Sequence, residues 1–130
     1  MNLNQITLPA IDVESSVRFY KTMGFEQIVA DDGYARFICP EGDTSFSIHA
    51  VKTLYPENEM IVYFECQQLD ETVTKLKSLG VAFEQEPVVQ AWLWREAYLR
   101  DPAGNRLCLY SAGDNRKNPP WRLPKKPASG

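Results

Sequence analysis

The sequence predicts an α+β fold of two tandem βαβββ modules, each containing a curved mixed sheet. The first observation is an internal repeat, because residues 13–24 align without a gap with residues 69–80, 56 positions further along the chain. Both segments carry apolar residues at helical spacing and end at a glycine, which suits a left-handed helix cap. Segments with alternating polarity flank both, as strands do. A repeat of this size indicates two similar modules packed together.

The two repeated segments are the predicted helices. Asp12 occupies the position of a helix N-cap before the first helix, and Asp70 lies in the first turn of the second, where a negative charge is favourable. Each helix has an apolar stripe for packing on a sheet. The stripes consist of Val13, Val17, Tyr20 and Met23 in the first helix and of Leu69, Val73, Leu76 and Leu79 in the second.

One strand precedes each predicted helix and three strands follow it. The preceding strands are residues 5–8 and 61–64, again 56 positions apart. The segments that supply the following strands are 25–30, 34–42 and 46–49 in the first module and 82–89, 96–104 and 107–110 in the second. Because strand residues alternate between faces, the steadily apolar parity is expected to pack on the helices. It consists of Ile6, Leu8, Ala35, Phe37, Phe46, Ile48, Val62, Phe64, Ala97, Leu99, Leu107 and Leu109.

The opposite parity is neither apolar nor plainly polar, and we call it the open face. It combines aromatic side chains with one arginine, the single histidine and two glutamates, a mixture typical of a concave small-molecule site. Aromatic residues and arginine are also enriched in subunit interfaces, so both interpretations stay open. The predicted ligand-binding residues are Arg36, His49, Tyr63, Trp92, Trp94, Tyr98 and Cys108, and the predicted catalytic bases are Glu65 and Glu96.

Two features of the open face suggest the chemistry of a ligand. Trp92, Trp94 and Glu96 are expected on one face, and flat aromatic walls beside a carboxylate suit a planar or cationic ligand. Phe64 and Cys66 flank Glu65, which predicts a desolvated carboxylate or one paired with Arg36 across a sheet. Alternatively, the two tryptophans plug the end of the barrel or pack in a dimer interface.

Composition excludes several classes of partner. Fourteen basic and 17 acidic residues give a net charge of −3, which does not favour nucleic acid or an anionic membrane. No apolar run approaches the roughly 20 residues of a membrane span, and the polar start lacks a signal pattern, so we expect a cytoplasmic protein. The three cysteines are widely spaced and fit reduced thiols.

The expected domain covers residues 1–112, with one module at 1–55 and the other at 56–112. Residues 113–130 form a basic, proline-rich tail, since the last twenty residues contain four of the nine prolines. We expect Trp121 to dock on the domain or on a second subunit, and the residues after Leu123 to be disordered.

Two motifs carry a resemblance to a known family. The first helix ends in F-Y-x-x-x-G-F at residues 19–25, and D-P-x-G-N at 101–105 leads into the last strand. Over about residues 3–111 the chain resembles the vicinal oxygen chelate superfamily, which includes glyoxalase I, bleomycin- and fosfomycin-resistance proteins and extradiol dioxygenases. The resemblance implies that each sheet curves into a half-barrel around a cup. It also implies that the cup closes within one chain or across a homodimer.

The resemblance further implies where a metal would bind. Family members use up to four ligands, and by register these positions are Gln5, Ser47, Ile61 and Cys108. Isoleucine offers no donor atom and the thiol replaces the usual glutamate, so no metal cofactor is expected. A shifted site with Gln5 and His49, and with Glu65 or Glu96, is the alternative and would hold Zn²⁺, Ni²⁺ or Mn²⁺. One histidine cannot form a two-histidine dioxygenase site within one chain.

The leading hypothesis is therefore a metal-independent protein that binds a small organic molecule, as bleomycin-resistance proteins do. Whether it is an enzyme stays open, because a metal-dependent lyase or isomerase resembling glyoxalase I is the competing hypothesis. A third is a domain that serves mainly in assembly. We expect Cys108 to pack inside the cup rather than to act as a ligand or nucleophile.

Overall fold

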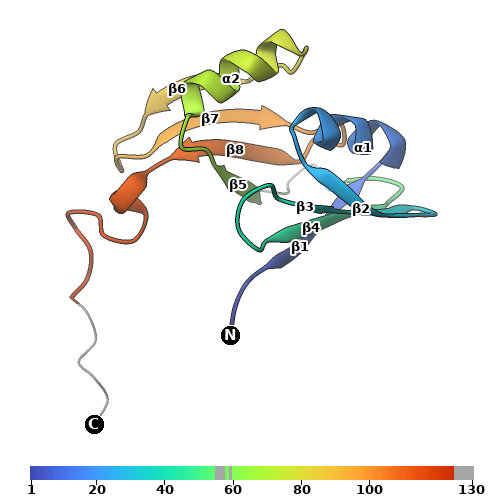
Figure 1. The fold of residues 1–130 in the computed structure, drawn as a ribbon, viewed down its shortest axis with the longest axis horizontal. Coiled ribbons are helices and arrows are strands. Elements are labelled where there is room, and N and C mark those ends of the chain that lie inside the picture. The colour runs from blue at the N-terminus through green and yellow to red at the C-terminus, as the bar shows by residue number, and fades with distance from the viewer. Residues whose placement is uncertain (55–57, 59, 125–130) are drawn as a thin grey trace.

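The computed structural model describes residues 1–54, 58 and 60–124, and it contains two four-stranded sheets that each carry one helix (Figure 1). The elements of the first module are β1 (Gln5–Ala10), α1 (Val13–Thr22), β2 (Glu26–Asp31), β3 (Tyr34–Ile38) and β4 (Ser45–Ala50). Those of the second are β5 (Ile61–Glu65), α2 (Leu69–Ser78), β6 (Gln85–Val89), β7 (Arg95–Arg100) and β8 (Arg106–Ser111), followed by the 3₁₀ turn η1 (Gly113–Arg116).

The two sheets have the same topology. The strand orders are β1-β4-β3-β2 and β5-β8-β7-β6, and in each sheet the first and last strands of the module pair in parallel while the other pairs are antiparallel. The predicted α+β fold of two βαβββ modules is thereby confirmed. The registers also correspond, because Thr7 faces Ser47 in the first sheet as Tyr63 faces Cys108 in the second.

Local signals at the helix ends act as the sequence predicts. The Asp12 side chain accepts hydrogen bonds from the backbone N–H groups of Glu14 and Ser15, at 3.1 and 3.4 Å. Gly24 and Gly80 follow the two helices with φ of 105° and 94°, a left-handed conformation that residues with a Cβ seldom adopt. The repeat therefore marks both helices and the glycines that terminate them.

Both helices lie on the same side of the sheets, and a single hydrophobic core joins the two modules (Figure 1). All twelve strand residues predicted to face the helices belong to this core. Phe64 of β5 crosses to the first module, with its ring 5.0 Å from that of Phe25 and 5.8 Å from that of Phe46.

Leu79 was wrongly included in the apolar stripe of α2, because this C-cap residue is 54% exposed. The more flexible Met23 packs against the core from the equivalent position of α1.

The turn between β7 and β8 fastens the second module to the first. One carboxylate oxygen of Asp101 accepts hydrogen bonds from the backbone N–H groups of Ala103 and Asn105, at 3.0 and 2.8 Å. The other accepts from the Tyr20 hydroxyl of α1 and from the Asn105 side chain, both at 2.7 Å. The Asn105 amide also donates to the carbonyl of Pro9, at 2.8 Å. The D-P-x-G-N motif is thus an inter-module clasp as well as a turn.

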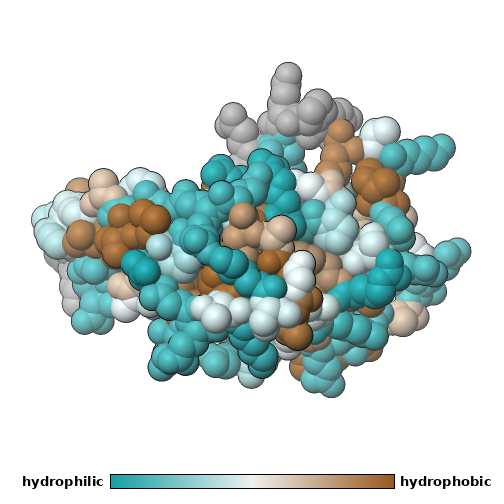
Figure 2. Space-filling view, turned by 90° about the horizontal axis from the view of Figure 1, so that it is seen from above, coloured by the Kyte–Doolittle hydropathy of each residue, from teal (hydrophilic) through white to brown (hydrophobic). Residues whose placement is uncertain are grey.

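Seen from the helix side, hydrophilic side chains dominate the surface, and hydrophobic ones form separate patches, one of them at the end where Figure 1 places the β6–β7 hairpin (Figure 2). Trp121 is 57% exposed, and the part of the tail predicted to be disordered lies mostly outside the described residues. Among the described residues, no helix has the length and apolar character needed to cross a membrane.

Candidate functional site

A cavity of about 420 Å³ lies on the open face of the second sheet. Four residues that the sequence analysis selected line it, namely Tyr63, Trp92, Trp94 and Glu96. Tyr63 comes from β5 and Glu96 from β7, whereas both tryptophans belong to the connection between β6 and β7. The alternation of β5 and β7 therefore brings the residues of both strands to one place, and the connection closes the cavity over them.

Glu96 is a buried carboxylate, with only 1% of its surface exposed. Its Oε1 accepts a hydrogen bond from the Tyr98 hydroxyl at 2.7 Å, and its Oε2 accepts one from the Trp92 indole N–H at 3.0 Å. None of the salt bridges found among the described residues involves it. Burying a carboxylate is costly without compensating partners, and both groups that donate hydrogen bonds to Glu96 are neutral.

Three aromatic rings form a wall beside this carboxylate. Trp94 stacks on Tyr110 with 4.6 Å between ring centres and 14° between planes, and Tyr63 meets both rings edge to face, at 5.9 and 5.8 Å. The Trp94 indole N–H donates to the backbone carbonyl of Asn115 in η1, at 3.2 Å. Tyr110 was not among the predicted site residues, although the alternation of β8 places it on the face that holds Cys108. No pattern in the sequence indicates that the backbone carbonyl of Asn115 would contact Trp94.

Cys108 lies at the floor of this face and is fully buried. Burial, followed by the negative charge of Glu96, raises the pKa of its thiol to about 12, so the thiol stays protonated at neutral pH. This supports packing rather than nucleophilic attack, which needs the thiolate. Burial and the hydrogen bond to Glu96 likewise raise the pKa of Tyr98, and the Arg106 guanidinium lies 4.5 Å from the centre of the Tyr98 ring.

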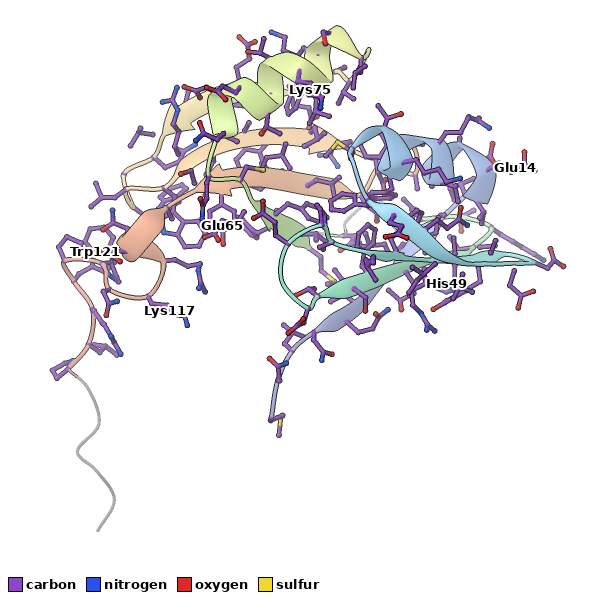
Figure 3. The ribbon with its side chains drawn as sticks, in the orientation of Figure 1. Glu14, His49, Glu65, Lys75, Lys117 and Trp121 are labelled. Atoms are coloured by element: carbon purple, nitrogen blue, oxygen red, sulfur yellow. The ribbon has the colours of Figure 1, made fainter. Side chains whose placement is uncertain are left out.

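Glu65 differs from Glu96 although both are on the open face. The prediction of a desolvated Glu65 is wrong, because 47% of its side chain is exposed and Arg116 of η1 lies 3.8 Å away. Arg36 does not pair with it. Figure 3 shows Glu65 on the second module near η1 and His49 on the underside of the first module, so these two predicted site residues do not face each other. Glu96 is covered by Trp92 of the preceding connection and by Tyr98 of its own strand, whereas the partner of Glu65 comes from η1.

The open face of the first sheet is polar. The Arg36 Nε donates to the Tyr34 hydroxyl at 3.0 Å, with the guanidinium 5.6 Å from the centre of that ring. Hydrogen bonds to Ser47, and then to Arg36, lower the pKa of Tyr34. The Ser47 hydroxyl accepts from the Gln5 amide at 3.0 Å and lies 2.8 Å from the Thr7 hydroxyl. Arg36 and His49 are exposed here, and both are outside the cavity of the second sheet.

The residues at the expected metal positions do not form a metal site. The Gln5 amide is hydrogen-bonded to Ser45 and Ser47, Ile61 has no donor atom, and Cys108 supplies a buried thiol where the family's usual ligand is a carboxylate. The shifted alternative is not assembled either, because Gln5 pairs with Ser45 and His49 with Pro9, at opposite ends of β1 and β4. Four strand residues span about 13 Å. Across the described part of the chain, no group of three or more His, Cys, Asp or Glu side chains could hold a metal.

Comparison with solved structures places this geometry among known relatives. A bleomycin-binding protein in complex with bleomycin is 25% identical, covers 85% of this chain and 98% of its own, and superposes with a TM-score of 0.70. A glyoxalase/bleomycin resistance protein/dioxygenase from Nocardioides is 21% identical, with coverages of 95% and 90% and a TM-score of 0.75. A lactoylglutathione lyase from Agrobacterium tumefaciens is 20% identical, with coverages of 85% and 92% and a TM-score of 0.70.

The comparison with curated proteins yields no match. The family model that matches covers residues 2–109, which is almost the whole of both modules. It agrees with the paired βαβββ topology and with the motifs at residues 19–25 and 101–105. The chain belongs to the glyoxalase/bleomycin resistance protein/dioxygenase superfamily.

Proposed function

We propose that this protein binds a small organic molecule whose planar, cationic part enters the cavity of the second sheet. The observation that carries the proposal is the buried Glu96 carboxylate, which has two neutral hydrogen-bond donors and no salt bridge within the described chain. A ligand cation would supply the missing positive charge, and the faces of Trp92 and Trp94 would add cation–π and stacking contacts.

The size and openness of the site agree with this role. A cavity of about 420 Å³ is within the usual range for small-molecule sites, and its lining is mostly aromatic with one carboxylate. Tyr63 and Trp92 are 44% and 46% exposed, so two aromatic side chains remain available to a ligand. The bleomycin complex of a structural neighbour supports small-molecule binding as the role of this fold.

We assign the polar open face of the first sheet to a further part of the ligand. Arg36 is exposed and is held by Tyr34, and no salt bridge of the described residues includes it. Arg36 and His49 would contact a polar or anionic substituent. The metal-dependent lyase hypothesis has no comparable support, because its proposed ligands Gln5 and His49 are at opposite ends of their strands. Homodimer formation and cytoplasmic location stay predictions.

Benzyltrimethylammonium, with its planar ring and fixed positive charge, is a direct probe of this proposal. We expect it to quench tryptophan fluorescence of the wild type on titration, and we expect benzoate, which has a similar ring but the opposite charge, to have no such effect. Glu96→Gln should weaken binding of the cation at least about tenfold, equivalent to about 1.4 kcal/mol, because it removes the buried negative charge.

Glu84→Gln is the matched control, because Glu84 is exposed and pairs with Arg100 away from the cavity. It should leave the affinity for benzyltrimethylammonium within about twofold of the wild type. Thermal melts would establish that both variants are folded. Equal affinity of folded Glu96→Gln and wild-type protein for the cation would refute the proposed function.

A further inference from the structure

The turn that carries the two cavity tryptophans has an unusual backbone. The Gln90 N–H donates to the carbonyl of Trp94 at 2.8 Å, and the Leu93 N–H donates to the carbonyl of Gln90 at 2.9 Å, which closes a tight β6–β7 hairpin. Leu93 completes the turn with a φ of 69°. In three-residue hairpin loops this left-handed position normally holds glycine.

Leu93 stands apart from the other left-handed positions of the described chain. Seven such positions occur, and six of them are glycines. A side chain at this backbone geometry brings its Cβ close to the carbonyl oxygen, a cost that glycine avoids. The burial of an apolar side chain can offset such a cost, but Leu93 is 41% exposed. The folded chain alone therefore offers little reason for leucine here.

The position of Leu93 supplies a reason. Its two neighbours in the chain, Trp92 and Trp94, both line the cavity, while Leu93 itself lies outside the lining at the tip of the hairpin. Val88, Val89, Trp92 and Leu93 are all exposed hydrophobic residues of the same hairpin. An apolar group lying across the hairpin tip would remove this surface from water.

We propose that Leu93 is a specificity-determining residue that contacts an aliphatic extension of the ligand outside the cavity. The inference rests on the proposed function and narrows its ligand class to amphiphilic organic cations, with a planar charged end inside and a hydrocarbon chain over the hairpin tip. The chain thus keeps a strained leucine at this turn because its side chain serves binding rather than folding.

Two cationic probes separate this contact from the cavity. Benzyltrimethylammonium fills only the cavity, whereas benzyldimethyloctylammonium, used below its micelle concentration, adds an eight-carbon chain. We expect Leu93→Gly and Leu93→Asn to weaken binding of the octyl probe at least about fivefold, since each buried methylene contributes about fourfold. Both variants should bind benzyltrimethylammonium within about twofold of the wild type. Asparagine tolerates the left-handed conformation and keeps a Cβ, so it tests side-chain chemistry without added backbone freedom.

The backbone strain at Leu93 can be measured by thermal unfolding of the same variants without ligand. Leu93→Gly should raise the melting temperature by about 4 °C, because it relieves the left-handed strain at little loss of buried surface. Leu79→Asn is the matched control, since Leu79 is similarly exposed but caps α2 on the helix side. It should change the affinity for neither probe.

The outcomes distinguish this inference from the proposed function. If Glu96→Gln weakens benzyltrimethylammonium but the Leu93 variants bind the octyl probe like the wild type, only the role of Leu93 is overturned. Equal weakening of both probes in the Leu93 variants also overturns it, because the leucine would then be a positioning residue. A melting temperature that falls in Leu93→Gly contradicts the strain. A wild type that binds neither probe overturns both proposals.

Discussion

The fully buried thiol of Cys108 predicts a specific loss of stability at alkaline pH. In the unfolded chain the thiol ionises near its ordinary pKa of 9.0, whereas in the folded protein its pKa is raised to about 12, mainly by burial. Between these values the unfolded state releases a proton that the folded state retains, so a rise in pH favours unfolding. We expect the free energy of unfolding to fall more steeply between pH 9 and about 11 in the wild type than in Cys108→Ala, as measured by urea denaturation.

Cys39→Ala is the control for this measurement, because Cys39 is only partly buried and its side chain belongs to the other module. It should keep most of the alkaline slope of the wild type. The raised pKa of Tyr20 acts in the same direction in every variant, so the comparison removes its contribution. Cys108 contributes to the raised pKa of Tyr98, so the difference between wild type and Cys108→Ala includes that contribution. Identical slopes in wild type and Cys108→Ala would contradict the burial of the thiol.

Residue alternation could be predicted from the sequence, but burial could not. The period of two along β7 and β8 places Glu96, Tyr98 and Cys108 on one face, because each strand determines its own alternation. Glu65 lies between Phe64 and Cys66, whereas Glu96 lies between Arg95 and Ala97, so the sequence neighbours favour burial of Glu65 rather than of Glu96. Glu96 is buried because Trp92 and Tyr98 donate to it, whereas Glu65 is at the edge beside Arg116. The donors to Glu96 depend on the conformation of the turn that carries Trp92, and the partner of Glu65 depends on where η1 packs, and neither follows from the neighbouring residue types.

The 3₁₀ turn η1 predicts that the functional domain extends beyond residue 112. Its Asn115 carbonyl accepts the indole N–H of Trp94, and its Arg116 pairs with Glu65. A chain ending at Ala112 should therefore fold but leave the Trp94 indole to water, with red-shifted tryptophan emission and at least about threefold weaker binding of benzyltrimethylammonium. Fluorescence spectra and calorimetric titration would measure both effects.

A chain ending at Lys117 is the matched comparison, because it retains η1 and also lacks Trp121. It should bind the cation like the full chain, with an emission maximum close to that of Trp121→Phe. If the two shortened chains behaved alike, η1 would have no role in positioning Trp94. Their comparison thus separates the turn from the remainder of the tail.

Elements with a strong local pattern were predictable, whereas the conformation of the β6–β7 connection that carries the two tryptophans was not. The stripe and the terminal glycines place α1 and α2 correctly, because helix periodicity and left-handed caps are local properties. The sequence analysis expected Trp92, Trp94 and Glu96 on one face, with Trp92 in phase only if the strand extended back to it. In the structure β7 begins at Arg95, and the tryptophans lie in a turn whose leucine occupies a position typical of glycine. A glycine there would have indicated the turn.

The shared core and the Asp101 clasp predict that the two modules unfold as one unit. The repeat predicts the internal pairing of each module, but it contains no information on how the modules pack together. That arrangement comes from contacts such as Phe64 with Phe25 and the hydrogen bond from Tyr20 to Asp101. Because these groups are buried, neither module can bury its helix-facing residues fully without the other.

The hydroxyl of Tyr20 provides the test of this cooperativity. Tyr20→Phe removes one buried hydrogen bond to a carboxylate and should lower the free energy of unfolding by about 1.5–3 kcal/mol. All three tryptophans are at position 92 or later, so their fluorescence follows the second half of the chain although the substitution is in the first. We expect the fluorescence and far-ultraviolet circular dichroism transitions to shift together to lower urea. Tyr34→Phe, on the open face of the first sheet, should shift both by less than about 1 kcal/mol. A fluorescence transition that stays in place while circular dichroism shows an earlier step would mean that the modules unfold separately.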